Sequence, residues 1–421
     1  MKIINGFKLA EEVLSRSTST AFYDNNLEPQ VKQIIDEVRG GGDAALFGCT
    51  LKFDRVKLSS LEVSKKQIKD AYRQVDEELT LALKLAADRI GFFHRKQKEM
   101  LAKPVAGQLI RPLERVGVYA PGGTAAYPST VLMTAIPAKI AGVKEVILTT
   151  PPRPDGTVAP ATLAAADIAG VDRIFSIGGA QAVAALAFGT DSVPAVDKIC
   201  GPGNILVVLA KKLVYGVVDI DGLPGPSEVI IIADETASPA YCAADLLAQA
   251  EHDPLASAIL ITTSERLADD VNKEVEKQLK GLERRDIAAE SLRKQGVIAV
   301  VADINQAVEL ANLYAPEHLC LMVKDADALV KQLTNAGCIV TGESATVVLG
   351  DYVFGPSHVL PTGATARFGS PLNVLDFVKF TSLLNVDKAT LKQLGKAAAA
   401  IARAEGFEAH ARAVEKRLKA D

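Results

Sequence analysis

The stretch Val229-Ile-Ile-Ile-Ala233 lies near the middle of this 421-residue chain and is apolar at every position. An alternating pattern would indicate a strand with one face in water. A continuous apolar run instead fits a strand that is covered on both faces, as in parallel sheets whose crossover helices lie on either side. The stretch therefore predicts an α/β fold with a buried strand at its centre.

Short apolar segments on both sides of this stretch are also predicted to be strands. One set comprises Val116–Tyr119, Glu145–Leu148, Arg173–Ile177 and Asp197–Cys200. The second comprises Glu228–Ala233, Ala258–Thr262, Val297–Val301, Leu319–Val323 and Cys338–Val340. Between the strands of the first set, Ala-rich helices are expected at Val131–Ala141, Ala159–Ala169 and Ala180–Phe188. Strands that alternate with helices indicate parallel sheets covered on both faces.

The remaining segments are expected to be helical. The first 25 residues or so are predicted to form a polar helical arm, and residues 387–418, rich in Ala and Lys, a separate helical tail. A helix near Pro29–Arg39 is expected to end at Gly40-Gly41-Gly42, and a long amphipathic helix to run from about Lys65 to Lys98. A chain of this length is expected to form two or more domains.

Composition excludes several classes of protein. The 47 basic and 51 acidic residues nearly balance, and no basic run with interleaved aromatic residues is present, so nucleic-acid binding is not expected. No apolar stretch approaches the ~18 to 20 residues that a membrane helix needs. The N-terminus lacks the apolar run and cleavage site of a signal peptide. We therefore expect a cytoplasmic protein without a membrane partner.

The five cysteines, an odd number, form no C-x-x-C pair. A disulfide framework or a thiolate zinc site is therefore not expected. Cys200 and Cys320 lie near motifs discussed below. A nucleophilic thiol is thus an alternative to the usual role of free cysteine as a small buried apolar residue.

Four turns rich in Gly and Pro are each expected to follow a strand, and most of them precede a helix. They are Ala120-Pro-Gly-Gly-Thr124, Gly178-Gly-Ala-Gln181, Gly201-Pro-Gly-Asn204 and Gly225-Pro-Ser-Glu228. Such turns can present backbone N–H groups to an anionic ligand beyond the carboxyl ends of strands. Each alone could be a plain turn, but together they favour a nucleotide cofactor. The usual dinucleotide fingerprint is absent, because its nearest match, Gly40-x-Gly42-x-x-Ala45, follows a predicted helix rather than a strand.

Four of the five histidines lie beside acids or amides. They are His252 in Gln249-Ala-Glu-His-Asp-Pro254, His318 in Pro316-Glu-His-Leu319, His358 in Gly350-Asp-Tyr-Val-Phe-Gly-Pro-Ser-His358, and His410 in Glu405-Gly-Phe-Glu-Ala-His410. Imidazole is the commonest protein metal ligand and changes its charge near neutral pH. The pattern predicts an enzyme with a metal and a proton-transfer group in one pocket.

Gln249 and His252 are three residues apart on a predicted helix and therefore share one of its faces. Asp351 and His410 would complete a set of nitrogen and oxygen ligands without cysteine, which suits a catalytic zinc. Gln249 and His252 alone are also compatible with a helix-end cap.

Glu317 and His318, at a loop-to-strand junction, can serve as two proton carriers. A structural histidine beside a solvated acid is the alternative. His94 is interpreted as structural, and His358 as a supporting partner of the site rather than a metal ligand.

These motifs resemble the histidinol dehydrogenase family over essentially the whole chain. The resemblance extends to Arg115-Val-Gly-Val-Tyr-Ala-Pro-Gly-Gly-Thr124 and His358-Val-Leu-Pro-Thr-Gly363. The family carries out the last steps of histidine biosynthesis. It oxidises L-histidinol to L-histidine with two NAD per turnover and a bound aldehyde, L-histidinal.

The resemblance implies a role for each matched residue. The zinc ligands, for one zinc per subunit, would be Gln249, His252, Asp351 and His410, and the acid–base pair would be Glu317 and His318. The NAD contacts would be Tyr119, Gln181 and Asn204. The substrate would contact Ser227 and Glu405 together with Gln249, His252, His318, Asp351 and His410.

The fold that the resemblance implies has two Rossmann-like parallel-sheet domains that lack the glycine fingerprint, a small helical N-terminal arm and a C-terminal tail. We expect the arm at 1–24, a main α/β domain with the zinc and catalytic residues at 25–118 and 229–372, an NAD-binding domain at 119–228, and the tail at 373–421. The family is a homodimer with shared active sites, in which the tail reaches the partner subunit.

The implied mechanism assigns His318 to take the alcohol proton as hydride leaves and Glu317 to activate water for attack on the aldehyde. His318 then assists the second hydride step, and no covalent cysteine step is needed. Two alternatives remain at this point. One is a zinc- and NAD-dependent dehydrogenase of another small alcohol, such as a sulfonated diol. The other is a zinc-bound interaction protein that has lost catalysis, against which Glu317 and His318 argue.

Overall fold

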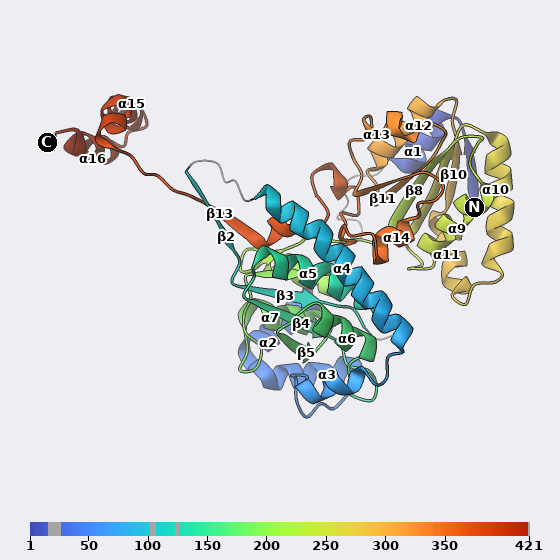
Figure 1. Ribbon diagram of the computed structural model, residues 1–421, viewed down its shortest axis with the longest axis horizontal. Coiled ribbons are helices and arrows are strands. Elements are labelled where there is room, and N and C mark those ends of the chain that lie inside the picture. Colours follow the sequence, from blue (N-terminus) through green and yellow to red (C-terminus); the bar gives the residue numbers. More distant parts are fainter. Residues whose placement is uncertain (16–26, 102–106, 123–125, 420–421) are drawn as a thin grey trace. The chain divides into compact units, whose positions relative to one another are not determined.

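The computed structural model describes residues 1–15, 27–101, 107–122 and 126–419, which divide into two units (Figure 1). The first unit comprises Met1–Met100 and Pro112–Val378, and the second comprises Leu101–Arg111 and Lys379–Asp421. Within the described ranges, no helix is both long enough and apolar enough to span a membrane.

The first unit contains a six-stranded sheet in which every pair of neighbours is parallel, with the order β1-β10-β9-β8-β11-β12. Its strands are β1 (Lys2–Asn5), β8 (Glu228–Ala233), β9 (Ser257–Thr262), β10 (Val297–Val300), β11 (His318–Met322) and β12 (Cys338–Thr341). Helices α9 (Pro239–Ala250), α10 (Glu265–Leu279) and α11 (Arg285–Gln295) cover one face, and α1 (Phe7–Leu14), α12 (Ile304–Tyr314) and α13 (Ala326–Val330) cover the other (Figure 1).

Strand β8 is buried along its whole length. Val229, Ile231 and Ala233 pack in the apolar cluster that includes α9, α10 and α11. Ile230 and Ile232 pack in the opposite cluster with α1 and α12. Because successive side chains of a strand point to opposite faces, an apolar run without interruption fills both cores. The prediction of a parallel α/β fold is therefore confirmed.

A second parallel sheet in this unit has five strands in the order β5-β4-β3-β6-β7. Its strands are β3 (Arg115–Tyr119), β4 (Glu145–Thr150), β5 (Arg173–Ser176), β6 (Lys198–Cys200) and β7 (Asp219–Ile220). The helices between them are α5 (Pro128–Ala141), α6 (Pro160–Ile168), α7 (Gly179–Phe188) and α8 (Ile205–Val214). The strand order reverses between β3 and β6, and open α/β sheets bind ligands at such a switch point.

Helices from the first hundred residues pack against the helices that cover this five-stranded sheet. They are α2 (Glu28–Cys49), α3 (Lys65–Ala71) and α4 (Glu77–Met100). Val31, Ile34 and Val38 of α2 share one apolar cluster with Phe175 and Leu186, and α4 packs against α5. From the sequence, residues 25–118 were expected to share a domain with the second set of strands. In the structure, α2, α3 and α4 pack with the elements of the first set instead. A helical apolar pattern shows which face is covered, but not which sheet covers it.

Three helical segments differ from the sequence expectation. The helical backbone is interrupted at the predicted Gly40-Gly41-Gly42 stop, since Gly42 has a φ of 53° and a ψ of −136°, but a second helical stretch continues directly to Cys49 within α2. The helix expected at 65–98 is two helices, since Asp76 starts α4 by accepting the N–H of Leu79 (2.6 Å). In the N-terminal arm, α1 is helical, but β1 precedes it and pairs with β10. Residues 16–24 of the expected arm lie outside the described residues.

The second unit consists of a tail and part of a short ribbon. Strand β2 (Gln108–Pro112) pairs with β13 (Val378–Ser382), and helices α15 (Lys388–Ala404) and α16 (Glu408–Leu418) follow. The two helices approach closely at Gly395, where an added Cβ would lie 2.9 Å from Cδ1 of Leu418. Arg403 forms ion pairs with Glu408 and Glu415 across the turn. The predicted helical tail is thus a compact helical hairpin.

Candidate active site

Glu317 and His318 lie at the amino end of β11 and are buried, with 7% and 5% of their surface exposed. His318 is in register with Val229 of β8 and Cys338 of β12. The pair therefore lies at the edge where the strands of the six-stranded sheet begin, opposite the edge where open α/β sheets usually bind ligands. Sequence analysis placed the pair at a loop-to-strand junction, and the structure agrees.

Glu228, the first residue of β8, holds both members of this pair. Its backbone N–H donates to Oε2 of Glu317 (2.8 Å), and its own Oε2 accepts the N–H of Glu317 (3.3 Å). Its carbonyl oxygen accepts a hydrogen bond from Nδ1 of His318 (3.3 Å). Sequence reasoning missed this role and treated Gly225-Pro-Ser-Glu228 as a turn for a nucleotide. The turn leads into β8, the strand that was predicted at Glu228–Ala233.

Burial and charge set the protonation of the pair. Burial raises the pKa of Glu317 to about 7, although the nearby His318 and the Glu228 N–H favour the carboxylate. Burial alone would lower the pKa of His318, but the carboxylates of Glu317 and Asp351 outweigh it and raise this pKa to about 9. An acid with a pKa near neutrality beside an imidazole can exchange protons at the pH of a cell.

Asp351 lies in the short helix α14 (Val347–Tyr352), and its Oδ1 is 3.3 Å from Nε2 of His318. Burial alone would raise the pKa of the Asp351 carboxyl. The hydrogen bond with His318 and the nearby rings of His358 and His252 outweigh burial, so this pKa lies below its usual value. Nδ1 of His358 donates to the backbone carbonyl of Asp351 (2.7 Å). The carboxylate thus contacts one imidazole, that of His318, and has two more nearby.

Thr346, which caps α14, connects this helix to α9. Its Oγ1 donates to Oδ1 of Asp245 in α9 (2.7 Å), and it also accepts the N–H of Val348 (3.4 Å). Because α9 carries the predicted ligand Gln249 at its end and α14 carries Asp351, this bond links the two elements.

Gln249 and His252 lie at the end of α9, where the N–H of His252 donates to the carbonyl of Gln249 (3.3 Å). Gln249 is 2% exposed, and its amide nitrogen has no hydrogen-bond partner among the residues that the structure describes. A buried amide group without a partner is expected where a water or an ion has not been placed. Amide, imidazole and carboxylate donors suit zinc, so these residues fit the expected metal.

The donor set of this unit is incomplete. Within the described part of the chain, no group of three or more His, Cys, Asp or Glu side chains is arranged to hold a metal. Predicted ligand His410 belongs to the second unit, where it is exposed with its ring centroid 5.2 Å from that of Phe407. Glu405, also exposed, ends α15 in the same unit.

The predicted NAD contacts lie at the carboxyl edge of the five-stranded sheet. Tyr119 ends β3, and its hydroxyl accepts the N–H of Gly179 (3.1 Å) at the start of α7. An added Cβ on Gly179 would lie 2.6 Å from Oε1 of Gln181, so this amide lies over the same turn. Asn204 caps α8, where its Oδ1 accepts the N–H of Leu206 (3.1 Å). Two of the three residues therefore meet at Gly179, beside the β3–β6 switch point.

Burial raises the pKa of Tyr119 to about 12, which keeps its hydroxyl protonated. Residues 123 and 124 of the expected Ala120–Thr124 turn lie outside the described residues. Ser227, an expected substrate contact, directly precedes Glu228, and its carbonyl accepts the N–H of Ser257 (2.9 Å).

The alternative of a nucleophilic cysteine finds no support at the two positions considered. Cys200 and Cys320 are buried, and burial raises the pKa of each thiol well above its usual value. A buried thiol of this kind is chemically inert.

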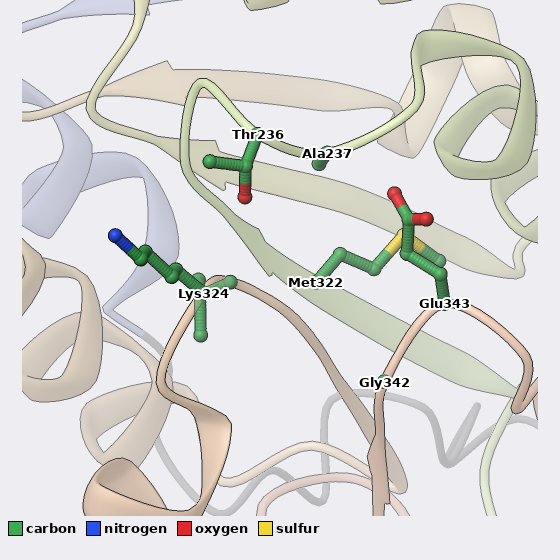
Figure 2. Close-up of a pocket in the computed structure, with 7 residues that line it drawn as sticks. Thr236, Ala237, Met322, Lys324, Gly342 and Glu343 are labelled. Atoms are coloured by element: carbon green, nitrogen blue, oxygen red, sulfur yellow. The ribbon is translucent and has the colours of Figure 1, made fainter.

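A cavity of about 290 Å³ lies at the carboxyl edge of the six-stranded sheet, away from Glu317 and His318 at its amino edge. Figure 2 shows Thr236, Lys324 and Glu343 around it, on loops that follow β8, β11 and β12. It contains none of the predicted site residues.

A buried Glu–His pair on one parallel sheet and a turn-lined switch point on another define a two-sheet α/β protein with a candidate proton-transfer site. Residues 17–418 match the family model of histidinol dehydrogenase. The chain belongs to the histidinol dehydrogenase family.

Individual relatives agree with this assignment. The chain is 59% identical to a histidinol dehydrogenase of Dehalococcoides mccartyi (strain CBDB1) over the full length of both proteins. It is 50% identical to that of Aquifex aeolicus (strain VF5), over 98% of this chain and 97% of the relative. The crystal structure of histidinol dehydrogenase from Elizabethkingia anophelis superposes with a TM-score of 0.94 at 36% identity, covering 100% of this chain and 98% of that one.

Proposed function

We propose that this chain oxidises L-histidinol to L-histidine in the cytoplasm by two successive two-electron steps, with NAD, one zinc ion per subunit and L-histidinal held between the steps. The observation that carries the proposal is the buried pair Glu317–His318 with Nε2 of His318 3.3 Å from Asp351. Two oxidations at one site need both a base for the alcohol and an activator for water, and this pair supplies two different proton carriers.

Different residues bind the zinc and accept the proton of the alcohol. When bound, NAD accepts hydride and zinc positions and polarises the substrate. Gln249, His252 and Asp351, with His410 of a partner subunit, would hold the zinc. In its neutral form, His318 keeps the Nδ1 proton that donates to the carbonyl of Glu228, and its free Nε2 accepts the proton of the alcohol.

Glu317 serves the second oxidation. Its carboxylate takes a proton from the water that adds to the aldehyde carbon, while His318 returns the proton it took from the alcohol to the aldehyde oxygen, which gives a hydrate. His318, neutral again, then accepts a proton from one hydroxyl of the hydrate as the second hydride leaves. The carboxylic acid that forms loses its remaining proton to solvent and becomes the carboxylate. The hydrogen bond from the Glu228 N–H holds the Glu317 carboxylate in place during this step.

NAD is proposed to bind at the carboxyl edge of the five-stranded sheet, against Tyr119, Gln181 and Asn204. The support is their position at the β3–β6 switch point and the convergence of Tyr119 and Gln181 on Gly179. The glycine fingerprint is not required, because the helix N-termini of α7 and α8 begin at this edge.

We further propose that the protein is a homodimer in which the tail completes the partner's site. The tail is a unit of its own that carries Glu405 and His410. It also exposes large apolar side chains, among them Leu384 (88% exposed) and Ile401 (61% exposed). Contiguous exposed apolar surface marks an interaction site.

The test is a substrate screen that follows NADH formation with the purified, zinc-loaded protein. Histidinol should be oxidised with higher kcat/KM than any other small alcohol, including sulfonated diols. A clear preference for another alcohol, with histidinol inactive, would replace the substrate while keeping the class of enzyme.

A further inference from the structure

Gly201 opens the Gly201-Pro-Gly-Asn204 turn, and a buried ion pair holds both of its backbone polar groups. Its N–H donates to Oδ2 of Asp221 (2.6 Å), and its carbonyl accepts from Nζ of Lys211 (3.1 Å). Lys211 and Asp221 also bind each other. Their side chains are 0% and 2% exposed. The two opposite charges therefore bind the peptide units on both sides of Gly201.

The backbone of this turn can adopt few other conformations at Gly201. Gly201 has a φ of 110°, and an added Cβ would lie 2.1 Å from the carbonyl oxygen of Tyr119. No other residue type fits this close approach to the end of β3. Lys211 comes from α8, and Asp221 directly follows β7, with its N–H bonded to the carbonyl of Ile199 (3.2 Å). The ion pair thus connects the turn to α8, β6 and β7.

Stability alone does not account for such a pair. Burying a lysine and a carboxylate costs desolvation energy, and apolar residues of similar size often serve stability equally well. What apolar residues cannot do is bind the N–H and carbonyl of Gly201. We propose that Lys211 and Asp221 are positioning residues that fix the Gly201–Asn204 turn, and with it the start of α8, for NAD. This inference rests on the proposed function, in which NAD contacts Asn204.

The test compares two double variants, because removing one partner would leave an unpaired buried charge. Lys211→Met/Asp221→Leu removes both bonds to Gly201. Lys211→Met/Asp221→Asn is also neutral, but its amide oxygen can still accept the Gly201 N–H. Loss of two hydrogen bonds should raise the Kd for NAD by roughly tenfold or more in the Leu variant, and the Asn variant should recover part of that loss. The KM for histidinol should stay near its wild-type value.

Lys198→Met provides the matched control. Lys198 is also a buried lysine, on β6, with ion pairs to Asp219 (2.9 Å) and Asp376 (3.5 Å). Its loss should lower the Tm and leave the Kd for NAD unchanged. Calorimetric titration with NAD and thermal melts of all four proteins supply the readouts.

Each outcome decides the matter. Wild-type protein that does not bind NAD would reject the proposed function itself. If wild type binds NAD but the Leu variant binds equally well, or if Lys198→Met weakens binding as much, the positioning role is wrong. If neither double variant folds, the pair is a folding requirement, and the positioning role is rejected as well.

Discussion

Nε2 of His318 lies 3.3 Å from Oδ1 of Asp351, so the proposed proton acceptor contacts a proposed zinc ligand. His318 is fixed by β11 and by the carbonyl of Glu228, while α14 and the ring of His358 fix Asp351. The proposed proton-transfer pair and the proposed metal-binding carboxylate are therefore parts of one hydrogen-bonded assembly at the amino edge of the six-stranded sheet.

Replacing Glu317 by Gln should impair the second oxidation much more than the first. The amide oxygen can still accept the Glu228 N–H, so the fold should persist, but an amide cannot take a proton from water. With histidinal supplied directly, the rate should fall by roughly 10²- to 10⁴-fold. Oxidation of histidinol to the aldehyde, measured in single turnover, should fall far less. Equal loss in both steps would contradict the assigned role of Glu317.

Chelation of the metal should abolish turnover and leave most of the fold intact. Gln249 and His252 lie at the end of α9, Asp351 in α14 and His410 in the second unit. Because the ligands come from separate elements, no one of these elements should need the metal in order to fold. Far-ultraviolet circular dichroism should change little, and added zinc should restore activity. A metal-free preparation that keeps full activity would reject the zinc site.

Cys320→Ala should retain both oxidations. Cys320 lies two residues after His318, but its thiol is 1% exposed and burial raises its pKa well above the usual value. Loss of a small buried side chain should cost about 1 kcal/mol or somewhat more in the free energy of unfolding. Complete inactivation with an unchanged melting temperature and intact NAD binding would instead favour a covalent thiol step.

The strand pattern could be predicted from sequence because burial leaves a direct mark on it. The apolar run at Val229–Ala233 gave the centre of one sheet, and Glu317-His318 could be placed at a strand's start. The role of Glu228 could not be predicted, since its contacts with Glu317 and His318 span 89 and 90 residues of chain. The packing of α2 with the five-stranded sheet's helices could not be predicted for the same reason. The periodic apolar pattern of α2 shows which face is buried, but it does not show which other apolar face covers it.

The shared-site proposal predicts complementation between inactive chains. A His410→Ala chain and a His252→Ala chain should each be nearly inactive. In a heterodimer of the two, one site carries both lesions and the other carries neither, so about half of the activity should return by the symmetry of a two-fold interface. Verified heterodimers that stay inactive, or an active monomer, would show that His410 does not act on a partner's site.

The most direct test of the central claim is the ratio of NADH formed to histidinol consumed in a single closed reaction. Two proton carriers, Glu317 and His318, at one buried site predict two NADH for each histidinol, with histidine as the product and little free aldehyde in solution. A ratio of one NADH per histidinol, with the aldehyde accumulating, would contradict the account.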